Sequence, residues 1–125
     1  MNNLTKEGSG GGIYAFGDLT IDGEKSTISN NIAKTWGGGI MVKTKTTINN
    51  CVICNNKAMT ESGGGIEVDG GELYLNKAKI YKNWCNKYGG GICCPTNKLF
   101  ISDKDEIDNM IYDNKAEKAG DNLYP

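Results

Sequence analysis

The sequence predicts an all-β protein, a right-handed, single-stranded parallel β-helix (a solenoid) with four coils of about 26 residues. Three observations predict this fold. The tetrapeptide Gly-Gly-Gly-Ile begins at residues 10, 37, 63 and 89, a period long enough for one supersecondary unit. A second motif, Ile followed three residues later by Asn, recurs in step with the first. Apolar residues at helical spacing, by contrast, never extend over the length of a stable helix.

Each coil is expected to contain three short strands. Strand side chains alternate between two faces, so the flanking apolar positions of each triplet face the same way. The first strands are expected at residues 13–15, 40–42, 66–68 and 92–94, and the second at residues 19–21, 46–48, 73–75 and 99–101. The third strands are centred on Ile28, Ile53, Ile80 and Ile111.

Stacking explains how such short strands form a core. Coils about 4.8 Å apart turn each aligned position into a column of side chains. The column of Ile13, Ile40, Ile66 and Ile92 is typical of five inward columns, in which Thr46 is the one polar member. Since parallel crossovers are right-handed, the coil is expected to be right-handed as well.

The recurrent asparagines have a structural interpretation. Asn tolerates the left-handed conformation of a turn, and stacked amides hydrogen-bond from coil to coil. We therefore expect a ladder, with a ligand-binding row of amides as the less favoured alternative. Its members are Asn31, Asn56, Asn83 and Asn114.

The chain is predicted to have one folded domain. Residues 1–9 are expected to form a polar N-terminal tail and residues 10–125 the β-helix, with a partial fifth turn at 120–125. Residues 103–109 lengthen the fourth coil as an exposed loop. The ends of a stack leave strand backbone groups unpaired. Because the tail is short and polar, we expect end-to-end self-association or missing upstream coils to cover the N-terminal end.

Composition limits the classes of partner. The net charge is −1, and the chain has neither Arg nor His. Without a global positive field we expect no nucleic-acid binding. No segment approaches the roughly 20 apolar residues of a membrane span, so membrane insertion is not expected either. The first residues contain no signal peptide, which needs an apolar segment.

No cofactor and no metal are expected. The number of cysteines, five, is odd and argues against a complete set of intrachain disulfides. Cys51 and Cys54 have the spacing of a zinc motif, but strand alternation places their sulfur atoms on opposite faces. Cys54 and Cys93 are expected to point outward. Four acids in the long fourth coil lack the Gly and Glu of an EF-hand loop, which favours a solvated loop over a calcium site. These acids are Asp103, Asp105, Glu106 and Asp108.

Catalysis is not expected. Polysaccharide lyases and glycoside hydrolases also use β-helices, and a glycoside hydrolase needs two facing carboxyls. The outward column of the first strands, which is Tyr14, Met41, Glu67 and Cys93, offers one acid. The turn acids, Asp18, Asp69 and Glu72, could converge, but exposed turn acids are mostly solvated. We assign no catalytic residue.

Two aromatic pairs are the candidate ligand-binding residues. Tyr74 and Phe100 align on the second strands, and Tyr81 and Tyr112 align on the third. Aligned rings stabilise neighbouring strands by about 0.2–1 kcal/mol per pair, and they also form a platform for a sugar or a protein. The packing role is the favoured alternative.

The paired Gly-Gly-x-Ile and aliphatic-x-x-Asn-x-Ala motifs resemble the repeats of chlamydial polymorphic outer membrane proteins and related β-helical adhesin-like proteins. The resemblance covers about residues 10–124, although Ile stands for the usual Phe of the second motif and Cys85 for an Ala. It implies a right-handed β-helix, a cell-surface or secreted setting, and adhesion to a host protein or glycan.

Three functions follow. The leading hypothesis is a non-catalytic, adhesin-like repeat module of a surface or secreted protein that binds a protein or a glycan. The runner-up is a polysaccharide lyase or glycoside hydrolase of β-helix type. The third is a structural spacer or assembly subunit.

Overall fold

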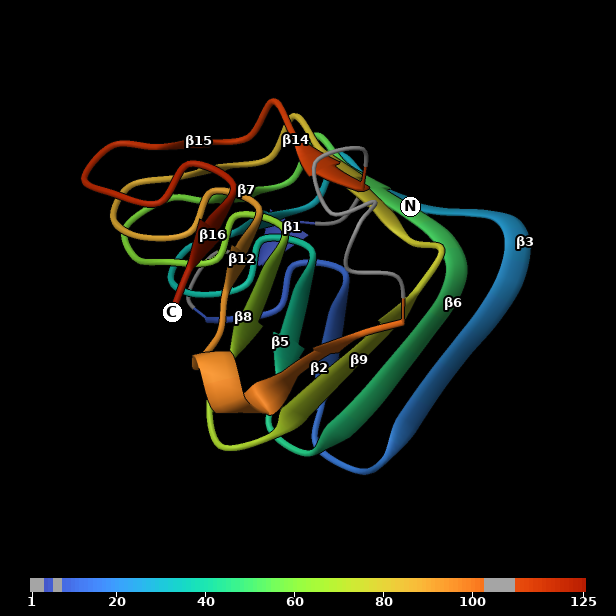
Figure 1. The fold of residues 1–125 in the computed structure, drawn as a ribbon. Helices are drawn as coiled ribbons and strands as arrows, with labels where there is room; N and C mark the ends of the chain where they lie inside the picture. Colours follow the sequence, from blue (N-terminus) through green and yellow to red (C-terminus); the bar gives the residue numbers. More distant parts are fainter. Residues whose placement is uncertain (1–3, 6–7, 103–109) are drawn as a thin grey trace.

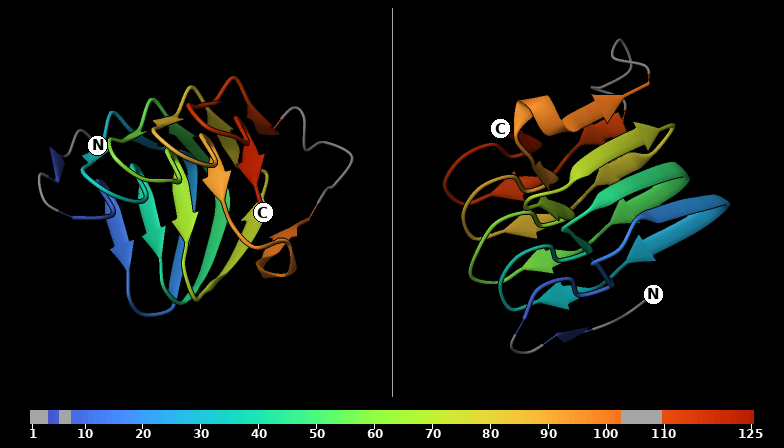
Figure 2. Two further views of the ribbon diagram at one scale, coloured as in Figure 1. Left: turned by 90° about the vertical axis from the view of Figure 1, so that its left-hand side faces the viewer. Right: turned by 90° about the horizontal axis from the view of Figure 1, so that it is seen from below.

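The structure, a computed structural model, describes residues 4–5, 8–102 and 110–125 and forms about four turns of a parallel β-solenoid. Each coil runs down one parallel sheet, up a second and across a third (Figure 1). In that view the chain turns anticlockwise while its coils approach the viewer, so the solenoid is right-handed. Successive coils lie side by side along the axis, with the two ends of the chain at opposite ends of the stack (Figure 2).

Three parallel sheets form the walls of the solenoid. Sheet A contains β1 (Leu4–Thr5), β4 (Ile32–Ala33), β7 (Lys57–Ala58), β11 (Trp84–Cys85) and β15 (Lys115–Ala116). Sheet B contains β2 (Ile13–Ala15), β5 (Ile40–Val42), β8 (Ile66–Val68), β12 (Ile92–Cys93) and β16 (Leu123–Tyr124). Sheet C contains β3 (Leu19–Ser29), β6 (Lys45–Cys54), β9 (Glu72–Asn76), β10 (Lys79–Tyr81), β13 (Leu99–Ile101) and β14 (Ile111–Tyr112). One 3-10 turn, η1 (Thr96–Lys98), precedes β13.

The predicted registers are confirmed. Ile40 pairs with Ile13 on one side and with Ile66 on the other, and Ile66 pairs with Ile92. The side chains of Ile40, Ile66 and Ile92 are fully buried in the core. Thr46, the polar member of the inward columns, is also buried, and its Oγ1 has no partner among the described residues.

The strands differ from the expected pattern in two places. In the first two coils the predicted second and third strands join into β3 and β6, which have 11 and 10 residues. A further sheet, sheet A, follows the predicted third strand. The corner between sheets C and A is the residue before each ladder asparagine, and this residue has a positive φ in every coil. It is Asn30, Asn55, Lys82 or Asp113, so the ladder asparagines themselves do not supply the left-handed turn.

The asparagine ladder is confirmed as the buried polar element of the solenoid. Asn83 Oδ1 accepts hydrogen bonds from the backbone N and the Nδ2 of Asn56, each at 3.0 Å. Asn83 Nδ2 donates to Asn114 Oδ1 at 2.9 Å and to the carbonyl oxygen of Ile53 at 3.0 Å. One amide therefore satisfies donors and acceptors on both neighbouring coils.

At both ends of the solenoid the chain itself supplies further partners. Leu4 and Thr5, within the predicted tail, pair with Ile32 and Ala33. At the other end Asn122 Oδ1 accepts from the backbone N and the Nδ2 of Asn114, each at 3.1 Å. Asn122 thus occupies the place of the next ladder asparagine.

Two further expectations concern the loop of the fourth coil and membrane insertion. The exposed loop at 103–109 and its four acids, the calcium alternative, fall outside the described residues. In the part of the chain that the structure describes, no helix is long and apolar enough to cross a membrane.

Replacing a ladder asparagine should be costly. We expect Asn83→Ala to lower the free energy of unfolding by roughly 2–4 kcal/mol, because the donors of Asn56 lose a buried acceptor. The matched control is Asn86→Ala, since Asn86 is exposed and its side chain makes one long bond of 3.4 Å to the carbonyl oxygen of Thr60. Urea unfolding measures both variants, and an equal effect of the two would contradict the structural role of the ladder.

Candidate functional site

The predicted aromatic pairs stack. The ring centroids of Tyr74 and Phe100 are 4.6 Å apart with 15° between the planes. Those of Tyr81 and Tyr112 are 5.2 Å apart with 6° between the planes. Each pair comes from strands that are neighbours in sheet C.

This stacking limits what the pairs offer to a ligand. Because the rings of a pair lie face to face, each covers one face of its partner, and only edges and outer faces remain for a sugar or a protein. Lys45 Nζ lies 5.1 Å from the Tyr74 centroid, and the Tyr74 hydroxyl donates to Glu72 Oε2 at 3.2 Å. Binding by these four aromatic residues stays a prediction.

A second candidate is a hollow between the outer face of sheet B and the loops that follow sheet A. Its volume is about 350 Å³. It draws residues from the first three coils, on sheet B, in the loops and just after the strands. The lining residues are Ser9, Tyr14, Trp36, Met41, Lys43, Glu67 and Asp69. We call this site the hollow.

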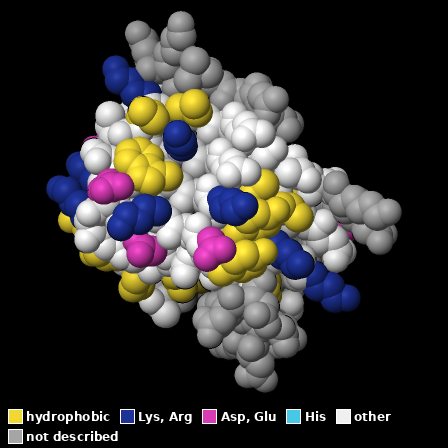
Figure 3. All heavy atoms as spheres, turned by 90° about the horizontal axis from the view of Figure 1, so that it is seen from above, with side chains coloured by type: hydrophobic (Ala, Val, Ile, Leu, Met, Phe, Trp, Pro, Cys, Tyr) yellow, Lys and Arg dark blue, Asp and Glu magenta, His cyan; other side chains and the backbone are white. Residues whose placement is uncertain are grey.

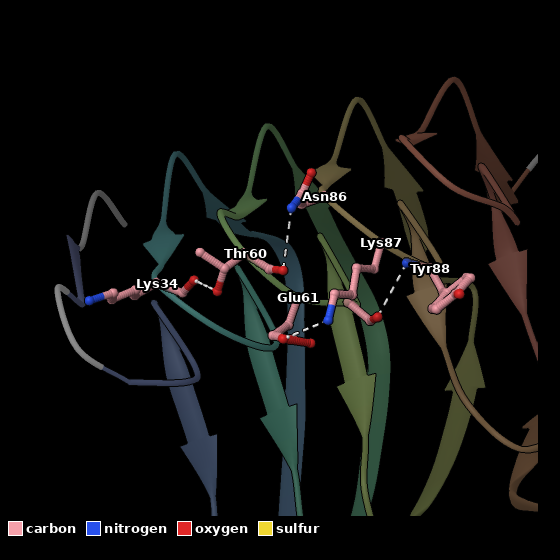
Figure 4. A network of polar contacts seen from close by, with 7 residues as sticks. Lys34, Thr60, Glu61, Asn86, Lys87 and Tyr88 are labelled. Carbon is pink, nitrogen blue, oxygen red and sulfur yellow. Dashed lines mark hydrogen bonds and ion pairs between the residues drawn. The ribbon is translucent and has the colours of Figure 1, made fainter.

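The loops after sheet A contribute Ser9 and Trp36 to the lining of the hollow. Residues 34–36, 59–62 and 86–88 of these loops stack from coil to coil, and we call them the loop wall; hydrogen bonds join its layers (Figure 4). Thr60 Oγ1 donates to the carbonyl oxygen of Lys34 at 2.7 Å, and Lys87 Nζ lies 2.9 Å from Glu61 Oε1. Toward the C-terminus Tyr88 of the wall stacks on Tyr124 of sheet B, with centroids 4.6 Å apart. The wall is therefore held close to the sheet.

The loop wall changes the environment of the outward column of sheet B. Met41 and Glu67 lie on that outward face, yet their exposed fractions are 3% and 9%. Tyr14, at the open end of the column, is 43% exposed, and Trp36 of the wall is 39% exposed. The alternation of side chains along a strand predicts correctly that Met41 and Glu67 point outward. It cannot predict that a loop will cover that face of the sheet.

Glu67 is the strongly perturbed acid of the hollow. Burial raises the pKa of its carboxyl from the ordinary 4.5 to about 7. The charges of Asp69 and Glu61 also raise this pKa, whereas a hydrogen bond with Cys93 and the charge of Lys43 lower it. Among the described residues, Glu67 Oε2 has no hydrogen-bond partner. Glu67 is thus a buried acid without a strong donor.

The other charges of the hollow neutralise each other. Lys43 Nζ lies 2.6 Å from Asp69 Oδ2, and this contact raises the pKa of Lys43. Ser9 Oγ is hydrogen-bonded to Thr35 Oγ1 at 2.8 Å. Among the described residues of the hollow, Glu67 is therefore the charged group without an ion-pair partner.

The cysteines have no separate site. All five are free thiols, and Cys93 alone is partly accessible. Cys54, which is expected to point outward, is 7% exposed and pairs in register with Tyr81 of the neighbouring coil. Burial raises the pKa of Cys93 and Cys94, which keeps both protonated. Within residues 8–102 and 110–125 no three His, Cys, Asp or Glu side chains lie close enough to hold a metal ion.

The sequence contains a signal for the hollow that composition alone does not reveal. The residue before each glycine triplet is Ser9, Trp36, Ser62 or Tyr88. The carbonyl oxygens of Trp36, Ser62 and Tyr88 each accept from the first glycine of the preceding coil, so these residues form one column. Two of these four positions, Trp36 and Tyr88, carry a large aromatic side chain, and Trp36 lines the hollow.

The perturbed acid predicts a pH-dependent stability. Because its pKa is higher in the folded protein, the contribution of Glu67 is fully present below about pH 4.5 and is lost as the pH rises through about 7. The free energy of unfolding of Glu67→Gln, relative to the original protein, should therefore increase by about 2–3 kcal/mol between about pH 5 and pH 8. Urea unfolding at both values measures it. Glu72→Gln, outside the hollow, should show no such trend, and a flat difference for Glu67→Gln would overturn the assignment.

The Tyr74–Phe100 stack predicts energetic coupling. A double-mutant cycle with Tyr74→Ala and Phe100→Ala should give an interaction energy of about 0.5–1.5 kcal/mol for unfolding. A cycle with Tyr74→Ala and Tyr112→Ala, which takes one ring from each pair, should give a value near zero. Equal coupling in the two cycles would show that the stack itself contributes nothing.

Comparison with known proteins supports the resemblance seen in the motifs. Residues 25–43 match the family model of the Chlamydia polymorphic membrane protein repeat. This segment is one repeat, and it extends from the end of β3 through the second glycine triplet to the residue after β5. No curated protein and no solved structure matches the chain.

Proposed function

We propose that this chain is a non-catalytic repeat module of a surface or secreted, adhesin-like protein, and that it binds a protein or glycan on its lateral surface. The observation that carries the proposal is the polymorphic membrane protein repeat at residues 25–43, set within a regular solenoid. A repeat of a membrane-protein family supports the surface setting.

The shape of the molecule supports a binding role. Stacked coils place side chains at fixed intervals on rigid faces, and repeat proteins bind their partners on such extended surfaces. The face seen from above mixes lysines and acids among separate hydrophobic groups, and the net charge of the chain is −1 (Figure 3). A mixed surface of this kind favours selective contacts over a general attraction to polyanions.

One observation favours the runner-up function. Glu67 and Asp69 line the same hollow, and the pKa of Glu67, about 7, suits a general acid. A glycoside hydrolase would use Glu67 as acid and Asp69 as the second carboxylate. Asp69, however, is exposed and pairs with Lys43, which leaves the binding function in the leading position.

A two-part experiment tests the proposal. The purified chain is applied to glycan and host-surface-protein arrays, and the same preparation is incubated with a panel of polysaccharides. We expect saturable binding on an array and no release of sugar products. Product release that Glu67→Gln abolishes would contradict the proposal in favour of the hydrolase, and silence in both assays would favour the spacer.

Variants then locate the binding face. If the aromatic pair of sheet C is the contact, Tyr74→Ala combined with Phe100→Ala should abolish array binding while the solenoid stays folded by circular dichroism. Unchanged binding in this variant would assign the two rings to packing alone.

A further inference from the structure

We propose that the hollow beside sheet B receives a lysine side chain of a partner protein, with the ammonium group at Glu67 and the aliphatic stem against Trp36, Tyr14 and Met41. The inference rests on the proposed function and makes it specific, because it selects a protein partner and the chemical group that is recognised.

The charge of the hollow favours a cation. Among the described residues that line it, carboxylates outnumber ammonium groups, and the pair of Lys43 and Asp69 leaves Glu67 unmatched. Titratable groups of the neighbouring strands and loops interact electrostatically with Glu67. These groups are Lys43, Glu61, Asp69, Cys85, Cys93 and Cys94. Lys43 is the only cation in this set, and Asp69 already binds it. A cation entering the hollow would relieve the cost of burying the Glu67 charge.

The carboxyl oxygen Oε2 of Glu67 is the atom that would accept the hydrogen bond of the ammonium group. Glu67 is 9% exposed and borders the hollow, while its Oε2 is enclosed and has no partner among the described residues. The terminal torsion of a Glu side chain is broad, so a small rotation presents either oxygen to the hollow. An ammonium group supplies strong donors to such an oxygen.

The apolar part of the hollow fits an aliphatic stem. Trp36 and Tyr14, each about 40% exposed, line it together with the buried Met41. Lysine side chains bury their methylene stems along apolar surface while the charged head finds a polar partner. Aromatic rings beside the path also attract an ammonium group through cation–π interaction.

The distribution of polar groups selects this ligand among amines and sugars. A sugar presents many hydroxyls and needs several free hydrogen-bonding groups, whereas Ser9, Lys43 and Asp69 already bind protein partners. A polyamine would need a second free acid. With one unmatched carboxyl and an apolar path to it, the hollow suits a single ammonium group on an aliphatic stem.

The test uses the whole chain and a defined probe. The peptide acetyl-Gly-Lys-Gly-amide is titrated into isotope-labelled protein, and amide chemical shifts are followed by NMR. We expect saturable shifts at Trp36, Met41 and Glu67. The same peptide with its lysine Nε acetylated should bind at least about tenfold more weakly, as the loss of a charge-assisted hydrogen bond implies.

Variants supply matched controls. Glu67→Gln keeps the side-chain shape and should weaken binding of the lysine peptide at least about tenfold, whereas Glu72→Gln, an equal charge change outside the hollow, should leave it unchanged. Trp36→Ala should also weaken binding. If Glu67→Gln fails to fold, the original protein provides the same information through pH, because affinity should increase from about pH 6 to pH 8 as Glu67 ionises while lysine stays charged.

Each contrary result overturns the inference. Equal binding of the acetylated peptide would show that charge is not recognised, and unchanged binding by Glu67→Gln would exclude its carboxyl. Tighter binding of spermidine or glucosamine than of the peptide would assign the hollow to a polyamine or an amino sugar. If the arrays still report a bound partner in these cases, the inference fails while the proposed function stands; polysaccharide cleavage would instead remove the proposed function itself.

Discussion

Contact between backbones at the glycine triplets is the constraint on which the rest of the structure depends. Gly38 N donates to the Gly63 carbonyl oxygen, and Gly39 N donates to that of Gly65, each at 3.0 Å. A Cβ atom placed on Gly64 would overlap the carbonyl oxygens of Gly90 and Trp84. A side chain on the glycine would not fit into this contact, and the bare backbone therefore lets the chain turn sharply between the loop wall and sheet B.

The same corner shapes both the ladder and the hollow. A Cβ atom on Gly65 would lie 3.0 Å from Asn83 Nδ2, so the bare backbone leaves room for the buried amides. On the other side, a Cβ atom on Gly63 would lie 2.7 Å from the Cβ of Glu67. Because the corner is so narrow, the loop wall lies against sheet B and removes Glu67 from water. The unusual chemistry of that acid is a consequence of backbone packing.

The sequence predicts the features that repeat in every coil, but it does not predict the features by which one coil differs from the next. Identical positions in four coils predicted the sheet B register and the asparagine ladder, since periodic side chains report directly on stacking. The joining of two strands into β6 was missed because its connecting residues carry no repeat. The hollow was missed for a related reason: Glu67 is unlike its counterparts in the other coils, and its approach to Trp36 depends on a loop that folds back over a sheet. The sequence predicted correctly that the four aromatic candidates stack in pairs. Because the rings of a pair come from neighbouring coils, they stack face to face, and each ring covers one face of its partner.

The most direct test of this account compares two glycines. Gly64→Ala places a methyl group against the backbone of the next coil, whereas Gly17 has nothing within 4 Å of the position that a Cβ atom would occupy. Urea unfolding of the two alanine variants, followed by far-ultraviolet circular dichroism, measures the difference. We expect Gly17→Ala to retain the original midpoint and Gly64→Ala to lose several kcal/mol or fail to fold. Equal tolerance of both substitutions would contradict the claim that close backbone contact at the corner holds the coils together.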